Sequence, residues 1–357
     1  MENFAEKMIR VDHRKLRRFV GSSFEKLGVP KADAEIAANA LVQADLRGVD
    51  THGVIRFSPH AWYVKWLTEG SMTASPKLRI ITENASTVLV DGDCGMGMVI
   101  GYRAMEMAIE KARSSGVAMV GVRNSRHYGM SAYYAMMALP HDMIGIAMTN
   151  ASRQVVPTFG RAAKYGTNPM CFAVPADKQQ PFVLDMATTT AAAGKLELAV
   201  RLGKSIPGGW ALDENAASTT DPRAAQKARR LLPLGGTRES GSHKGYGLAI
   251  LVEILCGVLT GTITALNANQ DPRGHFFAAV RVDAFRPAAE FQRDMDRLII
   301  DLKSTPPIEG QERVYVAGEI EFETAQERAE HGIPLHDSVL KGLRAVAEQV
   351  GVTYDLE

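Results

Sequence analysis

The stretch Gly241-Ser242-His243-Lys244-Gly245-Tyr246-Gly247 leads directly into an apolar run, Leu248–Leu266. The run predicts a helix in the middle of a globular core, with the glycines at its N-terminus. Exposed N–H groups and the positive end of the helix dipole favour an anion there. Glycines let the backbone approach a ligand closely, and His243 and Lys244 add two donors. A flexible helix start without a ligand is the alternative, which this stretch alone does not exclude.

A second stretch, Asp45-Leu46-Arg47-Gly48-Val49-Asp50-Thr51-His52-Gly53-Val54-Ile55-Arg56, also packs His, Arg and Gly between apolar residues. Its spacing predicts His52 and Arg56 on one helix face. Histidine suits acid–base chemistry near neutral pH, and arginine suits bidentate binding of a carboxylate. Surface contacts at a helix start are the alternative. Because the two clusters are far apart in sequence, they predict an active site assembled by folding.

The overall composition is that of an ordinary globular protein. The chain has 357 residues, of which 46% are hydrophobic and 23% charged, and its formal net charge is +1. This length supports two or more packed units with a large core. The balanced charge gives no sign of a nucleic-acid partner or a membrane surface. We therefore expect a small-molecule substrate and neither of those partners.

Cysteine usage and the N-terminus predict a cytoplasmic protein. Cys94, Cys171 and Cys256 share no metal-type spacing, and their odd number argues against a disulfide framework, so no metal site is expected. The N-terminal MENFAEKMIRVDHRK carries charges and lacks the apolar core of a signal peptide. Glu253 and two glycines interrupt the run Leu248–Leu266, which favours a core helix over a membrane span.

Strands and helices alternate along the chain, which predicts an α/β core. Helices are expected where apolar residues recur at helical spacing, and strands where short runs are apolar or alternating. The expected helices are 11–28, 31–47, 54–67, 102–113, 130–137, 288–302, 323–331 and 338–349. The expected strands are 77–82, 87–91, 117–122, 143–148, 172–174, 182–185 and 276–282. Residues 203–240, rich in Gly, Pro, Asp and Thr, are expected to form a long ordered loop.

The glycines Gly95, Gly97 and Gly101 follow an expected strand and open an expected helix. This is the position of a Rossmann fingerprint, but the spacing is GxGxxxG and no lone acidic residue follows about 20 residues later. A tight turn between strand and helix is therefore favoured over a Rossmann dinucleotide site.

Further polar segments follow expected strands, where α/β proteins place their sites. Asn124-Ser125-Arg126-His127-Tyr128-Gly129 offers backbone donors for a phosphate and a histidine for a substrate, or it is a surface turn. Thr167 offers a hydroxyl, Asp185 an acceptor for ribose hydroxyls, and Lys195 lies where the next helix begins. The chain carries no G-x-S-x-G, HExxH, CxxC or Walker motif, so hydrolase, zinc and NTPase functions lack support.

Taken together, these segments resemble one family. The chain resembles the malate/L-lactate dehydrogenases of the second type, or sulfolactate-dehydrogenase-like oxidoreductases, which include ureidoglycolate dehydrogenases, 2,3-diketogulonate reductases and cyclic-imine carboxylate reductases. The matching motifs are ADLRGVDTHGVIR, NSRHYG, GTNP, FVLDMATTTAAAGKLELA, IPGGWALDE with TTDP, LPLGG, GSHKGYGLA, GHFFAAV and AGEIE. They follow the family's order from about residue 40 to 320.

The resemblance implies an α/β fold unlike the Rossmann fold, with a mixed sheet and an N-terminal helical part. It implies a homodimeric NAD(P)-dependent oxidoreductase that transfers a hydride between nicotinamide and a small 2-hydroxy or 2-oxo acid, with malate or lactate favoured. Residues 1–75 and about 270–357 would form a helical unit for dimerisation and substrate binding. Residues 76–269 would form the NAD(P)-binding α/β unit.

The resemblance also implies roles for individual residues. The family's Ser/Thr-His-Gly motif corresponds to Thr51-His52-Gly53, and its substrate-clamping arginine to Arg56. The catalytic candidates are Thr51, His52, Arg56 and His127, and the substrate-binding candidates are Arg56 and Thr167. The cofactor-binding candidates are His127, Tyr128, Gly129, Met130, Ser131, Asp185, Met186, Ala187, His243 and Lys244.

The sequence leaves the choice of base, cofactor and substrate open. His52 and His127 compete for the role of base. NAD is favoured and NADP is the alternative, because Arg123, Arg126 and Lys244 suit a 2′-phosphate as well as a pyrophosphate. Thr51 stands where Ser is common and Ser242 where Gly is usual. Thr262–Arg273 diverges from the family, which leaves the substrate undetermined. A non-catalytic nucleotide-binding scaffold is the alternative outside the enzyme class, although every candidate catalytic position is polar and of a suitable type.

Overall fold

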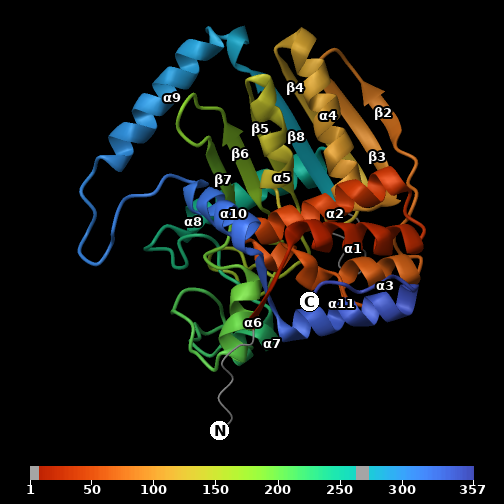
Figure 1. The fold of residues 1–357 in the computed structure, drawn as a ribbon. Helices are drawn as coiled ribbons and strands as arrows, with labels where there is room; N and C mark the ends of the chain where they lie inside the picture. Colours follow the sequence, from red (N-terminus) through yellow and green to blue (C-terminus); the bar gives the residue numbers. More distant parts are fainter. Residues whose placement is uncertain (1–7, 263–272) are drawn as a thin grey trace.

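A seven-stranded mixed sheet forms the centre of the protein (Figure 1). The structure, a computed structural model, describes residues 8–262 and 273–357. The strand order is β2-β3-β4-β8-β5-β6-β7, in which β3 and β4 are parallel and the other neighbours antiparallel. The strands are β2 (Arg79–Glu83), β3 (Thr87–Gly95), β4 (Val117–Ser125), β5 (Met143–Thr149), β6 (Met170–Val174), β7 (Phe182–Met186) and β8 (Arg273–Arg281). The predicted α/β core with a mixed sheet is thereby confirmed.

The two sides of β8 face different layers of helices. Phe277 and Ala279 belong to the larger apolar cluster with α4 (Gly97–Ser115), whereas Phe276 and Ala278 pack with Val252 of α8 (Ser242–Glu253). This alternation is what a strand buried on both faces requires. On the α4 side, α5 (Ala132–Ala135) and a 3₁₀ turn, η3 (Met136–His141), complete the cover. On the other side, α8 continues into a π-helical turn, η4 (Ile254–Val258).

The glycines after β3 allow α4 to start close to β4. A Cβ on Gly97 would lie 2.1 Å from the carbonyl oxygen of Arg126, a distance that no side chain tolerates. The favoured sequence interpretation, a tight turn between strand and helix, therefore accounts for Gly97.

A helical layer from both ends of the chain packs below the sheet in Figure 1. Its N-terminal part holds α1 (His13–Lys26), α2 (Lys31–Leu46), two 3₁₀ turns, η1 (Asp50–His52) and η2 (Val54–Arg56), and α3 (Trp62–Thr68). Its C-terminal part holds α10 (Glu319–His331), β9 (Ile333–His336) and α11 (Asp337–Val350). Antiparallel pairing of β9 with β1 (Met8–Val11) joins the two parts. Asp12 caps α1 by accepting from the amides of Arg14 and Lys15, as an N-cap aspartate does.

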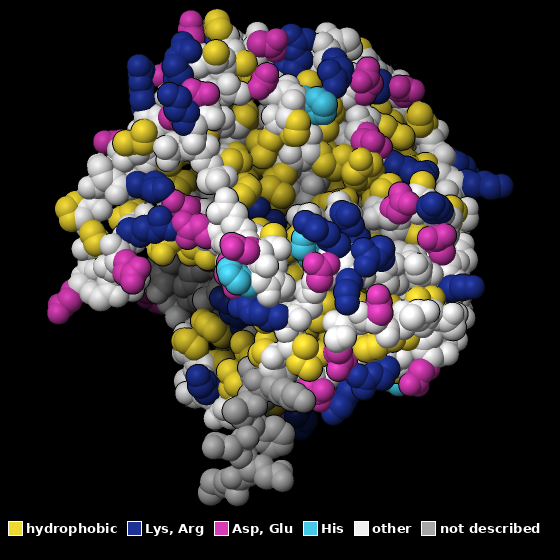
Figure 2. Space-filling view, viewed as in Figure 1, with side chains coloured by type: hydrophobic (Ala, Val, Ile, Leu, Met, Phe, Trp, Pro, Cys, Tyr) yellow, Lys and Arg dark blue, Asp and Glu magenta, His cyan; other side chains and the backbone are white. Residues whose placement is uncertain are grey.

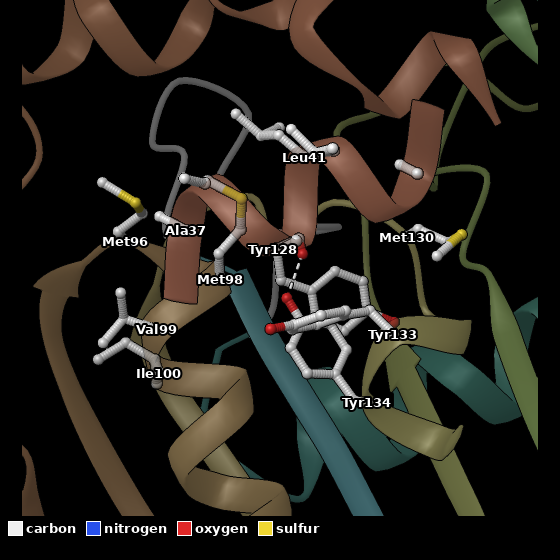
Figure 3. Packing of buried hydrophobic residues seen from close by; sticks show 14 of the residues in the cluster. Ala37, Leu41, Met96, Met98, Val99, Ile100, Tyr128, Met130, Tyr133 and Tyr134 are labelled. Atoms are coloured by element: carbon white, nitrogen blue, oxygen red, sulfur yellow. Dashed lines mark hydrogen bonds between the residues drawn. The ribbon is translucent and has the colours of Figure 1, made fainter. Parts of the chain in front are cut away.

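The helical layer and the sheet share one continuous core. Leu41 of α2, Met98 of α4 and Tyr134 of α5 meet there without solvent exposure (Figure 3). The strand β8 lies in the middle of the sheet, although the predicted division at about residue 270 assigns it to the helical unit. That two-unit division remains a prediction.

Two further segments lie outside these layers. Between β7 and α8 the chain forms α6 (Ala193–Arg201) and α7 (Pro222–Ala228), which pack around a smaller apolar cluster. After β8 come a 3₁₀ turn, η5 (Val282–Ala284), and α9 (Ala288–Lys303), which runs along the outside of the molecule in Figure 1. Figure 2 shows hydrophobic side chains gathered in the middle of this face, between α9 and α4.

Several sequence predictions need correction. The expected helix 54–67 is wrong in its first half, where η2 is followed by a turn, because Pro59 lacks an amide hydrogen and disfavours helical geometry at Ser58. His52 and Arg56 therefore do not share a helix face. The expected loop 203–240 contains α7, which Asp221 caps. The run from Leu248 is not buried all round, since four of its apolar side chains are at least 45% exposed.

Other expectations fall partly outside the described residues. The first seven residues of the N-terminus and the segment 263–272, which contains the end of the run Leu248–Leu266, are not described. Within residues 8–262 and 273–357, no helix has the length and apolar character needed to cross a membrane.

Candidate active site

The segment that carries Thr51, His52 and Arg56 is shaped by a buried carboxyl group. Asp45, at the end of α2, accepts a hydrogen bond of 2.8 Å from the amide of Val54 to its Oδ2. A Cβ on Gly53 would lie 1.8 Å from Oδ1 of the same carboxyl group, so only glycine fits there. Gly53 is extended, with φ −88° and ψ −153°, and separates the turns η1 and η2. The Asp45 carboxyl group thus binds the Val54 amide at the point where the sequence predicts the start of a helix.

The Asp45 side chain is buried, and burial shifts its pKa. Burial raises the pKa of the Asp45 carboxyl well above its usual value, and the nearby carboxylate of Asp50 raises it further. Arg328 of α10 opposes this shift, donating to the backbone carbonyl of Asp45 and to the side chain of Asp50. Helix α10 therefore holds the same segment from the other side.

Arg56 is held by its Nε, which leaves its outer nitrogens available. Nε donates to the carbonyl oxygen of Thr51 at 2.8 Å, and the guanidinium lies 4.5 Å above the ring of Trp62. No hydrogen bond joins the two Nη groups to another described residue, and the side chain is half-buried. A planar guanidinium with a fixed Nε and two open Nη groups suits a carboxylate.

Two imidazole rings lie next to this arginine. The rings of His52 and His127 are stacked, with centroids 5.5 Å apart and an interplanar angle of 16°. Thr51 Oγ1 lies 3.0 Å from Nδ1 of His52, and Trp62 contacts His127 at 4.6 Å between ring centroids. Folding therefore brings two of the sequence-predicted histidines together from segments 75 positions apart.

Loss of water around both rings lowers their pKa values. For His52, desolvation first and the charge of Arg56 second lower the pKa to about 4. For His127, desolvation is again the largest cause, followed by Coulombic repulsion from a protonated His52 and from Arg273, and the pKa lies well below its usual value. Both rings are therefore neutral at physiological pH in the free protein.

The residues after His127 face the core. Tyr128 is fully buried, stacks on His275 at 4.7 Å, and donates to or accepts from Ser131 Oγ at 2.6 Å. Figure 3 shows its ring beside Tyr134, which donates to the carbonyl oxygen of Tyr128. Met130 and Ser131 are 3% and 2% exposed. Of residues 127–131, only His127 is not buried.

Asp185 lies at the end of β7, beside the start of α5. Its Oδ2 accepts from the amide of Ala132 at 2.7 Å, which caps that short helix. Loss of water around the carboxyl group is the largest influence on its pKa and raises it to about 6, although the Ala132 amide and Arg47 lower it. The Asp185 residue nevertheless keeps solvent exposure at this strand end. Met186 and Ala187, the next two residues, are half-buried.

A chain of backbone contacts connects this strand end with the histidine segment. Thr188 donates from its amide and from its hydroxyl to the carbonyl oxygen of Thr167, each at 2.9 Å. The next helix, α6, begins so close to Thr51 that a Cβ on Gly194 would lie 2.5 Å from Thr51 Cγ2. The motifs around residues 51, 167 and 188 therefore converge. Lys195, also at the start of α6, is exposed and lies 5.9 Å from the ring of Trp210.

Three glycine-containing segments meet at the N-terminus of α8. A Cβ on Gly236 would lie 2.8 Å from the carbonyl oxygen of Gly209, and one on Gly235 would lie 2.6 Å from the carbonyl carbon of Gly241. On α8 itself, a Cβ on Gly245 would lie 2.4 Å from the carbonyl oxygen of Leu234, whereas Gly247 faces open space. The amide of Leu234 in turn donates to Thr188, which joins this region to β7.

The exposed side chains at this helix start are basic. His243 and Lys244 are exposed, and Nη1 of Arg238 lies 3.1 Å from Nδ1 of His243. The helix has 12 residues, so its first-turn amides present a dipole of ordinary strength. Glycine backbone, the positive end of a helix dipole and basic side chains fit the pyrophosphate of a dinucleotide.

Some residues at the site act through long-range contacts that no sequence pattern indicates. Tyr63 donates or accepts at Nδ1 of His127, and His275 lies between Ser125 and Thr149 with hydrogen bonds of 2.9 and 2.8 Å. Glu253 accepts from the side-chain amide of Asn168 at 3.2 Å. The only sequence signals were a charge inside an apolar run, Glu253, and a histidine inside a strand, His275. Neither signal predicts which residue the side chain contacts.

A half-buried arginine with open Nη groups, stacked imidazoles and a glycine-rich basic helix start together suit a class of protein that oxidises or reduces small hydroxy acids. The family model for malate/L-lactate dehydrogenase matches residues 11–344. The chain belongs to this family and is a nicotinamide-dependent oxidoreductase.

Its relatives narrow the class further. Malate dehydrogenase of Pyrococcus horikoshii is 43% identical over 97% of both chains, and L-sulfolactate dehydrogenase of Methanocaldococcus jannaschii is 36% identical over 95% of this chain and 96% of that one. Among solved structures, malate dehydrogenase of Entamoeba histolytica matches with a TM-score of 0.93 at 34% identity, covering 98% of this chain and all of the other. The structure of the Methanocaldococcus jannaschii sulfolactate dehydrogenase matches with a TM-score of 0.86 at 34% identity, over 97% of this chain and 98% of that one. The predicted sulfolactate-dehydrogenase-like fold is confirmed.

Proposed function

We propose that this protein is an NAD(P)-dependent malate dehydrogenase, which interconverts a 2-hydroxy acid and the corresponding 2-oxo acid. The observation that carries the proposal is the guanidinium of Arg56, fixed through Nε with its Nη groups open, next to the stacked rings of His52 and His127. Relatives at 43% and 42% identity are malate dehydrogenases, which supports malate over lactate.

Each residue has a task that its geometry supports. Arg56 binds the C1 carboxylate and thereby orients C2, and the two imidazoles lie where they can reach the oxygen on C2. Thr51 orients His52 through Nδ1. Thr167, whose carbonyl oxygen accepts from Thr188, is proposed as a substrate-contacting residue. A nicotinamide cofactor supplies the hydride acceptor when bound. The chain's contribution is binding, orientation and proton transfer.

The cofactor would be held by two regions. His243 and Lys244 at the start of α8 would bind the pyrophosphate, and the backbone of 127–131 together with Asp185, Met186 and Ala187 would line the path toward the histidines. NAD is the preferred cofactor in this proposal and NADP the alternative. Dissociation constants for NADH and NADPH, measured by fluorescence, decide between them.

A homodimer in the cytoplasm completes the proposal. Leu251, Ile254, Val258 and Leu259 form an apolar stripe at helical spacing along α8 and η4, and they are 45% to 62% exposed. Such a stripe is typical of a subunit interface. Light scattering after gel filtration would show twice the mass of 38.7 kDa, and a monomer would contradict the dimer.

The activity test follows nicotinamide absorbance with malate, lactate, sulfolactate, ureidoglycolate and a cyclic imine acid. Turnover with malate well above the others is the expected result. Greater turnover with one of the other acids would identify that acid, and not malate, as the substrate. Tight NADH binding with no turnover of any of them would favour the non-catalytic scaffold.

A further inference from the structure

The hydrogen bonds of His127 restrict where its ring can carry a proton. Nδ1 lies 2.7 Å from the hydroxyl of Tyr63 and accepts from the amide of Gly129 at 3.2 Å. A backbone amide can only donate. Nδ1 therefore carries a lone pair and no hydrogen.

Tyr63 is the second donor to the same nitrogen. Its side chain is fully buried, and loss of water raises the pKa of the phenol above its usual value, so the hydroxyl stays protonated. Because Nδ1 has no hydrogen to give, the Tyr63 hydroxyl donates to it. A neutral imidazole has one hydrogen, and with Nδ1 occupied by two donors this hydrogen is on Nε2.

His52 has a different environment. Its one hydrogen bond among the described residues joins Nδ1 to Thr51 Oγ1 at 3.0 Å. A hydroxyl can accept as well as donate, so Nδ1 of His52 can carry the hydrogen and leave Nε2 as an acceptor. The two stacked rings can thus have complementary states, one presenting a donor and the other an acceptor.

We propose that Tyr63, together with the Gly129 amide, holds His127 as a permanent Nε2–H hydrogen-bond donor, so that His52 is the residue that exchanges a proton with the substrate. The second part of this proposal rests on the function proposed above. Tyr63 is a positioning residue, because it acts through His127 and not on the substrate.

The reaction step balances in this arrangement. In the oxidation direction the C2–H bond breaks, and a bound nicotinamide would accept the hydrogen together with its electron pair as hydride. The O–H bond breaks, its proton passes to Nε2 of His52, and its electron pair forms the second bond of C2=O. His127 donates a hydrogen bond from Nε2 to the same oxygen and ends the step with its own proton unchanged. A neutral donor of this kind stabilises developing negative charge on oxygen.

The first test needs neither cofactor nor substrate. Protein labelled with ¹⁵N in its histidine rings is compared with the His127→Asn variant to assign the His127 signals. The expected result is a protonated Nε2 and an unprotonated Nδ1 in the wild type. In Tyr63→Phe, we expect the Nδ1 signal to shift as a second tautomer becomes populated. A protonated Nδ1 in the wild type, or no change in Tyr63→Phe, would overturn the proposed role of Tyr63.

The second test compares glutamine and alanine at both histidines. The side-chain amide of glutamine can donate a hydrogen bond from about the position of Nε2, but it cannot accept a proton. His127→Gln should therefore recover about 10-fold or more of the turnover lost in His127→Ala, because only donation is needed there. His52→Gln and His52→Ala should both lose about 10²- to 10⁴-fold, the usual contribution of a proton-transfer group. If His52→Gln, and not His127→Gln, recovers the turnover lost in the alanine variant, the two histidines have the opposite roles and the proposal is refuted.

The kinetic effect of Tyr63→Phe separates positioning from folding. We expect about a 10-fold fall in kcat with KM for substrate nearly unchanged, since Arg56 still binds the carboxylate. Unchanged kcat would overturn the positioning role, and so would a fall accompanied by loss of thermal stability and of NADH binding. If no 2-hydroxy acid is turned over, the proposed function fails together with the role of His52. The tautomer of His127 is still decided by the ¹⁵N spectra alone.

Discussion

The histidine segment and the start of α8 are built by opposite means. Around His52 and His127, a buried carboxyl group, a phenol and an arginine fix the positions of half-buried side chains. Around Gly241–Gly247, the backbone comes close to neighbouring segments, and the charged side chains point to solvent. The first region should therefore be sensitive to changes of functional group, and the second to any added volume on its buried side.

The largest effect is expected from a substitution that adds side-chain volume at the start of α8. Gly245→Ala puts a Cβ 2.4 Å from a backbone oxygen, so the helix start must move, which should cost about 3 kcal/mol and abolish NADH binding. Gly247→Ala is the matched control on the same turn, because nothing lies within 4 Å of its Cβ. It should stabilise the helix by about 0.5–1 kcal/mol. Thermal unfolding and NADH titration measure both, and equal behaviour of the two variants would contradict the close-packed backbone.

The next effect concerns the functional group of Arg56. Arg56→Lys keeps the charge but loses the planar fork and the Nε bond to Thr51, so kcat/KM for oxaloacetate should fall about 10- to 100-fold. NADH affinity should be unchanged. Arg17→Lys, at an exposed position of α1, is the control and should have wild-type kinetics. If Arg56→Lys weakens NADH binding as much as turnover, Arg56 belongs to the cofactor region.

A smaller effect is expected at Asp45 and depends on pH. The folded-state pKa of this carboxyl is raised, so the stability that it contributes is complete below its unfolded pKa and is lost as pH rises toward the folded pKa. Asp45→Asn cannot ionise and keeps an oxygen for the Val54 amide. The variant should gain about 1 kcal/mol over the wild type at pH 8 and nothing at pH 4. Urea unfolding at both pH values tests this, and a gain confined to low pH would reverse the assigned direction.

The smallest effect is expected from the exposed charge of Lys244. Lys244→Ala should weaken NADH binding by about 1 kcal/mol or less, and the difference should shrink at high salt because solvent screens the charge. Lys31→Ala, at an exposed position at the start of α2, is the control and should not affect binding. A loss of more than 100-fold that persists at high salt would mean that side chains, not backbone, dominate this region.

The sequence predicted the sheet and most helices because their signals are local. α1, α2 and the strands follow from the spacing of apolar residues, and α7 could have been found from Asp221-Pro222, an N-cap followed by proline. The resemblance supplied the candidate residues, but it did not decide whether His52 or His127 is the base. Their difference depends on Tyr63, a contact across 64 positions that no local pattern encodes. Likewise, the Asp45 carboxyl group can accept from the Val54 amide, and so prevent a helix there, only after the chain has turned back beyond the end of α2.

The position of β8 has a consequence for how the protein is made. β8 separates β4 from β5 and pairs with both, yet it follows β5 in the chain by more than a hundred residues. At about 5–20 residues per second, a ribosome needs roughly ten seconds to synthesise the intervening segment. During that time the nascent chain presents two unpaired strand edges, which attract other chains. We therefore expect the sheet to close only after synthesis has passed Arg281, and release of the nascent chain before that point to yield aggregates instead of a smaller folded unit.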